Sequence, residues 1–291
     1  MPVPDGAALA ALAFLALAWG YNWVVMKVAL QYSAPFSFAA TRSVGGGLCL
    51  LLVLVLARRP LKPRHPWRTL LLGLLQTSLF IGLVSWSLVE GGAGKSAVLA
   101  YTMPFWVMLF APFVLGERLR GGQWLAVALA FAGLTLIFSP WHRAPDFMSG
   151  CIALCAGIAW GLSVLVAKKI PVADRWELLS LTGWQMLMGA VPLLVAAWLV
   201  PGRPLEWTWP YGLALAYNII PGNALAWALW LFVLGRLSAT VSGLASLATP
   251  VVGVLCGWWQ LGERPSPVVC AGMLLVFIAL ALLPLAVRNK N

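Results

Sequence analysis

Residues 19–27 of this chain read Trp-Gly-Tyr-Asn-Trp-Val-Val-Met-Lys, and residues 160–168 read Trp-Gly-Leu-Ser-Val-Leu-Val-Ala-Lys. Both stretches open on Trp-Gly, close on lysine and lie within apolar sequence. The same short phrase therefore occurs twice, and the second copy begins 141 residues after the first.

A second phrase repeats with nearly the same offset. Pro104 is followed by Leu-Gly-Glu-Arg at 115–118, and Pro250 is followed by Leu-Gly-Glu-Arg at 261–264, which is an offset of 146 residues. A duplicated unit of this size in an apolar chain is typical of membrane proteins that are built from two related halves.

The composition excludes a soluble protein. Of the 291 residues, 62% are hydrophobic and only 9% are charged, and the mean hydropathy is +0.92. One membrane-spanning helix needs about 20 apolar residues, so the chain has room for ten helices and for no soluble catalytic domain. The lead before the first helix is too short and too poor in basic residues for a signal peptide, so we expect the first helix to direct its own insertion.

Hydrophobic runs bounded by proline, glycine and charged residues predict ten membrane-spanning helices. The expected ranges are 7–30, 35–57, 67–89, 95–115, 122–139, 147–168, 176–199, 209–234, 238–260 and 266–287. The eighth range contains Pro221-Gly222, where we expect a break or a bend, because proline cannot complete the helical hydrogen-bond ladder.

The lysine and arginine residues lie unevenly on the two sides of the predicted spans. One side holds thirteen of them, namely Arg58, Arg59, Lys62, Arg64, Arg68, Arg118, Arg120, Lys168, Lys169, Arg175, Arg236, Arg288 and Lys290. The other side holds five, namely Lys27, Lys95, Arg143, Arg203 and Arg264. The richer side is expected to be cytoplasmic, and it carries both chain ends.

The number of spans in each half gives the repeat a direction. Each half holds five spans, an odd number, so the second half must enter the membrane from the opposite side. We therefore expect an all-α membrane protein made of two inverted repeats, at residues 1–141 and 142–291. In such folds the substrate site lies near mid-membrane between the halves, which rock to expose it alternately.

The predicted spans lack the residues that several kinds of chemistry require. All eight acidic residues lie at or near span ends: Asp5, Glu90, Glu117, Asp146, Asp174, Glu177, Glu206 and Glu263. Without a carboxylate at mid-membrane, proton-coupled pumping loses its simplest carrier. Both histidines fall in loops, so we expect no enzyme activity, no metal and no cofactor. The basic residues lie in loops and argue for no nucleic-acid partner, and the five cysteines are expected to be small core residues.

Two features inside the spans have two readings each. Pro104 and Pro250 can be packing kinks, or hinges that also free a carbonyl for a substrate ammonium. Arg42 can be a structurally paired arginine, which we favour slightly, or a carboxylate or gate contact. The Leu-Gly-Glu-Arg runs are expected to be structural, closing their helices and pairing with loop charges.

Together these phrases resemble the EamA family of the drug/metabolite transporter superfamily. The first-helix phrase stands here as Trp19-Gly20-Tyr21-Asn22 with Lys27, and the Pro and Leu-Gly-Glu-Arg phrase stands twice at the spacing given above. The resemblance covers essentially the whole chain. Within the family, the chain is similar to the YddG-type exporters of aromatic amino acids and related metabolites.

The resemblance implies a basket of ten helices around a central cavity, with the fifth and tenth helices packed away from it. It implies cavity-lining roles for Gln76, Phe80, Tyr101, Met103, Trp160, Ser163, Asn218 and Ser246. Polar and aromatic residues elsewhere inside the spans are secondary candidates: Trp19, Asn22, Arg42, Gln185, Trp227 and Thr249.

The expected function is export of amino acids, aromatic and other neutral ones, by alternating access and without proton coupling. The protein is expected in the inner membrane, in contact with lipid, as a monomer with both ends in the cytoplasm. Export of drugs, nucleotide sugars or other metabolites is the alternative within the superfamily. A membrane scaffold without transport is the alternative of another class, and polar residues inside four spans argue against it.

Overall fold

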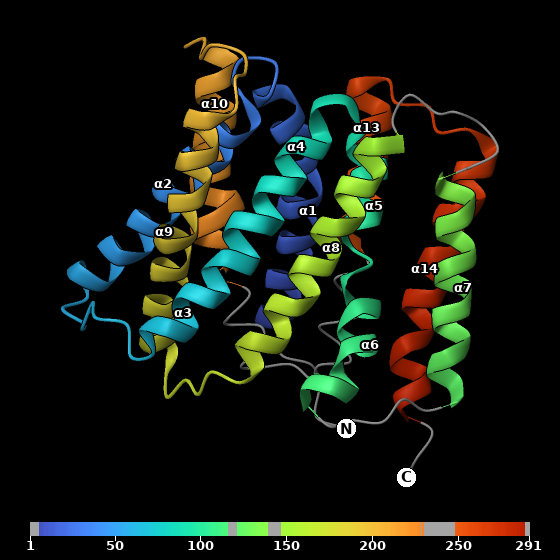
Figure 1. Cartoon of the computed structure of the whole chain (residues 1–291), viewed down its shortest axis with the longest axis horizontal. Helices are drawn as coiled ribbons and strands as arrows, with labels where there is room; N and C mark the ends of the chain where they lie inside the picture. The colour runs from blue at the N-terminus through green and yellow to red at the C-terminus, as the bar shows by residue number, and fades with distance from the viewer. Residues whose placement is uncertain (1–5, 116–120, 139–146, 228, 230–247, 289–291) are drawn as a thin grey trace.

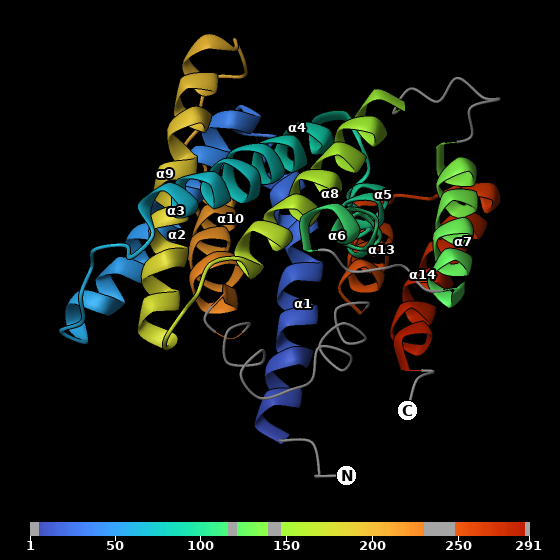
Figure 2. The ribbon, with the colours of Figure 1, turned by 60° about the horizontal axis from the view of Figure 1, so that its bottom comes forward.

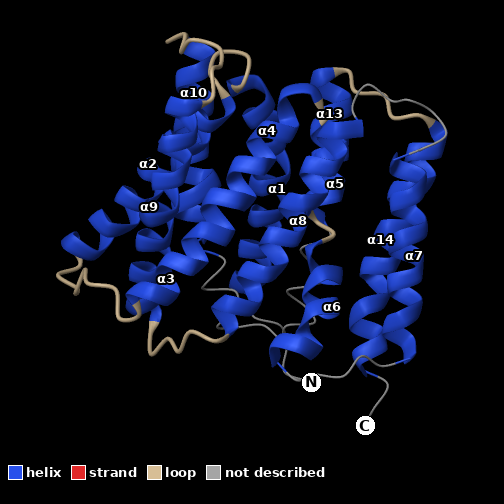
Figure 3. Cartoon of the chain, in the orientation of Figure 1, coloured by secondary structure: helices blue, strands red, loops and turns tan. Residues whose placement is uncertain are grey.

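The structure is a computed structural model that describes residues 6–115, 121–138, 147–227, 229 and 248–288. Within these ranges every regular element is helical, and no strand is present (Figure 3). Six stretches in the same ranges are long and apolar enough to cross a membrane: Ala10–Ala29, Pro35–Leu56, Pro66–Glu90, Ala93–Val114, Phe147–Lys168 and Arg175–Leu199. The shorter apolar stretches are Val127–Ile137 and Pro267–Ala279. The protein is an all-helical membrane protein.

The helices follow the hydrophobic runs. The first half contains α1 (Gly6–Ala29), α2 (Pro35–Leu56), α3 (Pro66–Gly73), η1 (Leu74–Ile81), α4 (Gly82–Glu90), α5 (Ala93–Ala100), α6 (Met103–Leu115) and α7 (Gly121–Phe138). The second half contains α8 (Phe147–Lys168), α9 (Arg175–Leu199), α10 (Trp209–Ile219), η2 (Ile220–Leu225), α13 (Ala248–Leu261) and α14 (Pro267–Arg288).

Three of the predicted spans are not simple α-helices. The third is continuous from α3 to α4 but is wound as a π-helix in η1. The fourth is interrupted by a turn at Tyr101-Thr102, so Pro104 lies in the first turn of α6, where a missing N–H costs little. The eighth is π-helical in η2, at the Pro221-Gly222 pair where a bend is expected.

The longest helix-to-helix contacts join the two halves through glycine. α2 packs along α9, and α7 packs along α14 at one side of the molecule (Figures 1 and 2). A Cβ added to Gly133 of α7 would lie 2.7 Å from the Gly272 carbonyl oxygen of α14. Small residues permit such close crossings, which supply the packing contacts that lipid cannot.

The remaining contacts occur in matched sets. α1 packs on α13, and α8, whose Trp-Gly phrase matches that of α1, packs on α5 and α6. α2 contacts α10 and η2, while α9, its counterpart in the second half, contacts α3 and η1. Each of these contacts thus has an equivalent in which the two halves exchange roles.

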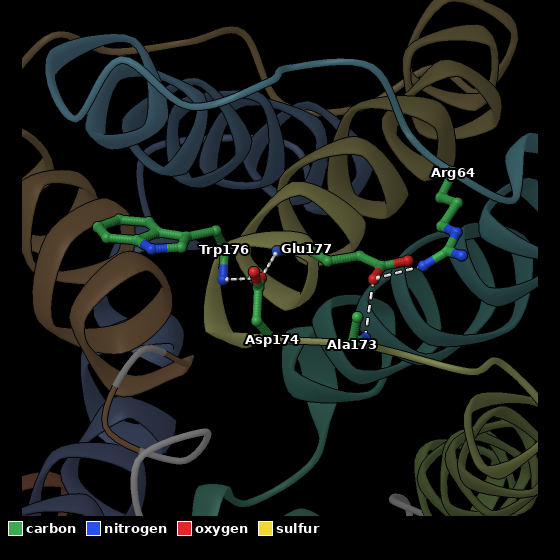
Figure 4. A network of polar contacts seen from close by, with 5 residues as sticks. All are labelled: Arg64, Ala173, Asp174, Trp176 and Glu177. Carbon is green, nitrogen blue, oxygen red and sulfur yellow. Dashed lines mark hydrogen bonds and ion pairs between the residues drawn. The ribbon is translucent and has the colours of Figure 1, made fainter.

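The ends of the helices define two edges. α1 begins and α14 ends at the same edge, the lower one in Figure 1. At this edge Asp174 caps α9 by accepting hydrogen bonds of 2.8 Å from the amides of Trp176 and Glu177 (Figure 4). Glu177 accepts from the Ala173 amide at 2.8 Å and pairs with Arg64 at 3.4 Å, so the 57–65 loop is tied to the start of α9.

At the opposite edge, the repeated phrases meet. Gly262 ends α13 with φ +68°, a left-handed conformation that glycine adopts without strain. The carboxylate of Glu263 then accepts from the Ala93 amide at 2.6 Å and the Gly94 amide at 3.0 Å, which caps α5. Lys27 donates to the Gly91 carbonyl just before that cap. Glu263 therefore closes a helix of the other half, whereas Glu117-Arg118 lie outside the described residues.

Candidate functional site

A cavity lies where the two halves meet. It has an empty volume of about 520 Å³, which includes the space at its mouth. The first half lines it with residues of α1, α2, η1 and α4 and with Tyr101, and the second half with residues of α8 and η2 and with Trp227.

One wall of the cavity is aromatic. The rings of Phe80 and Trp160 are stacked, with centroids 4.9 Å apart and an interplanar angle of 28°. Tyr101 meets Trp160 edge to face at 5.1 Å, and Trp23 lies 6.5 Å from Tyr101. The turn between α5 and α6 positions Tyr101, and Gly161 allows α8 to approach α6, because a Cβ there would lie 2.9 Å from the Cβ of Trp106.

A second aromatic pair closes another side. Trp19 meets Trp227 at 5.5 Å with an interplanar angle of 66°, and its Nε1 donates to the Gly222 carbonyl at 3.0 Å. Gly20 brings α1 against α13, because a Cβ there would lie 2.5 Å from the Cβ of Val252. Trp19 and Trp160, which occupy matching places in the repeat, thus both line the cavity.

The polar part of the cavity centres on Arg42, whose side chain is only 3% exposed. Its Nη2 donates to Asn223 Oδ1 at 3.3 Å, and Nδ2 of Asn223 donates to the Arg42 carbonyl at 3.2 Å. Its Nη1 and Asn22 Nδ2 both donate to the sulfur of Met26, at 3.0 and 3.4 Å. Within the described chain, Arg42 Nε and Asn22 Oδ1 are buried and have no hydrogen-bond partner.

Seven of the predicted site residues line this cavity. They are Phe80, Tyr101 and Trp160 of the primary set and Trp19, Asn22, Arg42 and Trp227 of the secondary set. Thr249 is buried in α13 but is not among the lining residues. The predicted set thus gathers mainly around the two aromatic pairs and Arg42.

The other predicted residues lie elsewhere. Ser163 and Asn218 are fully buried and donate to carbonyls of their own helices, those of Trp160 at 2.7 Å and Ala214 at 3.0 Å. Gln185 accepts from Thr77 at 2.8 Å and joins α9 to η1. Gln76 in η1 and Met103 at the start of α6 are half-buried and do not line the cavity. Ser246 falls outside the described residues.

Six lining residues are absent from the predicted set. They are Trp23, Met26, Ile81, Val84, Gly222 and Asn223. For two of them a signal exists, because positions 19, 22, 23 and 26 follow the spacing of one helical face. Asn223 carries a weaker signal as a polar residue inside a span, next to the Pro-Gly pair.

Comparison with known proteins gives one family. The model of the "EamA-like transporter family" matches residues 6–139 and 148–284. The chain is 28% identical to an uncharacterized transporter, YoaV, of Bacillus subtilis (strain 168), over 89% of this chain and 90% of the relative. It is 29% identical to a probable amino-acid metabolite efflux pump of Salmonella typhimurium, over 92% of both chains.

Two further similarities bear on substrate and fold. A riboflavin transporter of Rhizobium johnstonii is 27% identical, over 93% of this chain and 87% of the relative. A solved crystal structure is similar in fold, with a TM-score of 0.69 and 19% identity, over 98% of this chain and 100% of the other.

Proposed function

Since this chain belongs to the EamA-like transporter family, whose members are transporters and not enzymes, we propose that it exports amino acids across the inner membrane. The favoured substrates are aromatic and other neutral amino acids, and the mechanism is alternating access. The family match covers both halves of the chain, so each half contributes one repeat to the transport unit.

The matched helix contacts support an inverted arrangement of residues 1–141 and 142–291. The contact of α1 with α13 corresponds to the contact of α8 with α5 and α6 when the two halves are exchanged. A two-fold axis in the membrane plane requires this correspondence. The edge that holds the Arg64–Glu177 pair also holds the basic loops after α2 and α8. We assign this edge, with both chain ends, to the cytoplasm.

The observation that carries the proposed substrate is the division of the cavity into an aromatic wall and a polar centre. The stacked Phe80–Trp160 pair and the edge of Tyr101 offer flat apolar surface to a ring or a branched side chain. Aromatic pairs in such geometries are worth about 0.5–1.5 kcal/mol beyond the area that they bury. Asn22 and Arg42 offer hydrogen bonds to the polar end of the same molecule.

The lining of the cavity supports transport without proton coupling. No carboxylate is among its lining residues within the described chain, and a proton carrier in a membrane is most simply a carboxylate. The halves would rock by bending at three places. These are the Tyr101-Thr102 turn beside Pro104, the π-helical η2 that contains Pro221, and Pro250 of α13.

Riboflavin is the second candidate substrate. The Phe80–Trp160 stack also suits a flat fused ring, and one relative is a riboflavin transporter. Export of drugs or nucleotide sugars, and a scaffold role without transport, are further alternatives that the same experiment separates.

The test is counterflow into liposomes that contain the purified protein. The panel comprises phenylalanine, tryptophan, leucine, riboflavin, UDP-glucose and tetraphenylphosphonium, each with and without a pH gradient. We expect flux of the amino acids, independent of the gradient. Trp160→Ala and Tyr101→Ala should reduce it about tenfold, because each removes part of the aromatic wall.

The matched control is Trp198→Ala, a tryptophan of α9 that is 84% exposed and remote from the cavity. It should transport like the parent protein. The cavity assignment is refuted if Trp160→Ala and Tyr101→Ala also transport like the parent. Flux of riboflavin, UDP-glucose or tetraphenylphosphonium without flux of amino acids refutes the amino-acid proposal, and no flux at all favours a scaffold.

A further inference from the structure

Arg42 is a buried cation without a carboxylate in the described part of the chain. Among the described residues, the recorded ion pair is Arg64–Glu177, which lies at the cytoplasmic edge, far from the interior of α2. Arg42 itself is 3% exposed and contacts a sulfur and an amide oxygen, while its Nε has no partner. A guanidinium carries five N–H donors and stays charged, so this environment leaves its hydrogen-bonding capacity largely unused.

Burying such a charge is expensive. Thioether sulfur is a weak acceptor, and removing a cation from water costs several kcal/mol unless a counter-charge or good hydrogen bonds replace the solvent. Ionisable residues inside membranes are rare and face cavities or pathways. Because Arg42 lines the cavity, an anionic group that enters the cavity can supply the missing counter-charge.

Asn22 adds a second unfilled position beside the first. Its Nδ2 shares the Met26 sulfur with Arg42, so both side chains converge on one atom, while its Oδ1 is buried and accepts no hydrogen bond. Gly222 faces this oxygen, and a Cβ at Gly222 would lie 3.1 Å from it. Without that Cβ, Gly222 leaves room beside this buried acceptor.

We propose that Arg42 binds the carboxylate of the transported molecule and that Asn22 Oδ1 accepts a hydrogen bond from its ammonium group. This rests on the proposed function and specifies its ligand: an α-amino acid held by both charged groups, with its side chain against Phe80, Tyr101 and Trp160. Asn223 Oδ1 accepts from the guanidinium while Asn223 Nδ2 donates to the Arg42 main-chain carbonyl, so the planar donor face is oriented before the ligand arrives.

The test measures binding rather than flux. Isothermal titration calorimetry of the purified full-length protein in detergent compares three probes that share a phenyl ring. Phenylalanine has both charged groups, phenethylamine lacks the carboxylate, and 3-phenylpropionate lacks the ammonium. We expect the parent protein to bind phenylalanine at least about tenfold more tightly than either analogue, since each analogue leaves one buried group unpaired.

Substitutions then assign each group. Arg42→Gln should weaken the binding of phenylalanine and of 3-phenylpropionate by about tenfold or more, and it should change the binding of phenethylamine by no more than about twofold. Arg42→Lys keeps the charge but loses the fork and should weaken phenylalanine less than Arg42→Gln does. Asn22→Leu should weaken phenylalanine and phenethylamine while sparing 3-phenylpropionate. Arg264→Gln, at an exposed arginine, should bind all three probes like the parent.

The outcomes separate this proposal from a structural role and from the proposed function. Equal weakening of all three probes by Arg42→Gln would mean that Arg42 only holds η2, and the proposal would be overturned. Equal binding of phenethylamine and phenylalanine by the parent would overturn it even if no variant folds. Binding of 3-phenylpropionate that depends on Arg42, without binding of amino acids, would support the anion site and refute the amino-acid function alone.

Discussion

Replacing Glu263 tests the contact that joins the second half of the chain to a helix of the first. Its two carboxylate oxygens accept hydrogen bonds from the Ala93 and Gly94 amides, at 2.6 and 3.0 Å. Glu263→Gln leaves one accepting oxygen for two donors, because the amide nitrogen of glutamine cannot accept. It also removes the negative charge that lies at the N-terminus of α5.

The expected cost follows from these contacts. A hydrogen bond to a charged group contributes about 1.5–3 kcal/mol, and Glu263 is half-buried, so we take about 2 kcal/mol for the lost bond and charge together. That corresponds to a roughly 30-fold rise in the local opening equilibrium at the start of α5.

Amide hydrogen exchange followed by mass spectrometry measures this opening. Peptides that cover 91–101 should exchange roughly 30-fold faster in Glu263→Gln, while peptides of α7 and α14 should be unchanged. Glu206→Gln, at an exposed carboxylate in the loop at the same edge, is the control and should leave all peptides unchanged. A change of less than about twofold at 91–101 would show that the cap does not hold α5.

Two further predictions concern packing and topology. Gly189→Ala should lower the thermal unfolding midpoint in detergent, at a cost of about 1–3 kcal/mol, because the new Cβ would lie 2.6 Å from Thr77 Cβ and closer still to the Gly73 carbonyl oxygen. Gly212→Ala, where nothing lies within 4 Å, is its control, and equal midpoints for the two variants would contradict the crossing of α9 and η1. Cysteines at positions 64 and 203 should react with impermeant maleimide from opposite sides of the membrane, because position 64 lies beside the start of α9 and position 203 follows its end. Labelling of both from one common side would refute the inverted repeat.

The length of the hydrophobic runs predicts the helices, because the bilayer imposes the length of a membrane-spanning helix. The predicted range 35–57 corresponds to Pro35–Leu56, and 147–168 to Phe147–Lys168. The positions at which a span is interrupted are harder to predict from the sequence. Pro104 suggests a kink within one helix, but the chain instead makes a turn at Tyr101-Thr102 and begins a new helix.

Polar residues in the spans indicate candidates for the cavity but not which way they point. Ser163 and Asn218 each donate to a carbonyl of their own helix and are not among the lining residues of the cavity, a local bond that serine and asparagine readily make. In a soluble helix the apolar face reveals the core, whereas here lipid-facing and protein-facing sides are both apolar. Rotation about each helix axis therefore needs the packed structure.

The sequence by itself determined the number and length of the apolar runs, the repeat and the uneven distribution of basic residues, because lipid and charge act on each segment separately. Only the tertiary structure decided that Arg42 of α2 meets Asn223 of η2, and that Glu263 caps α5 across the halves. Both contacts join residues about 170–180 positions apart. Contacts at that separation depend on how the helices pack, and helices in lipid pack by shape and a few polar groups that no local pattern encodes.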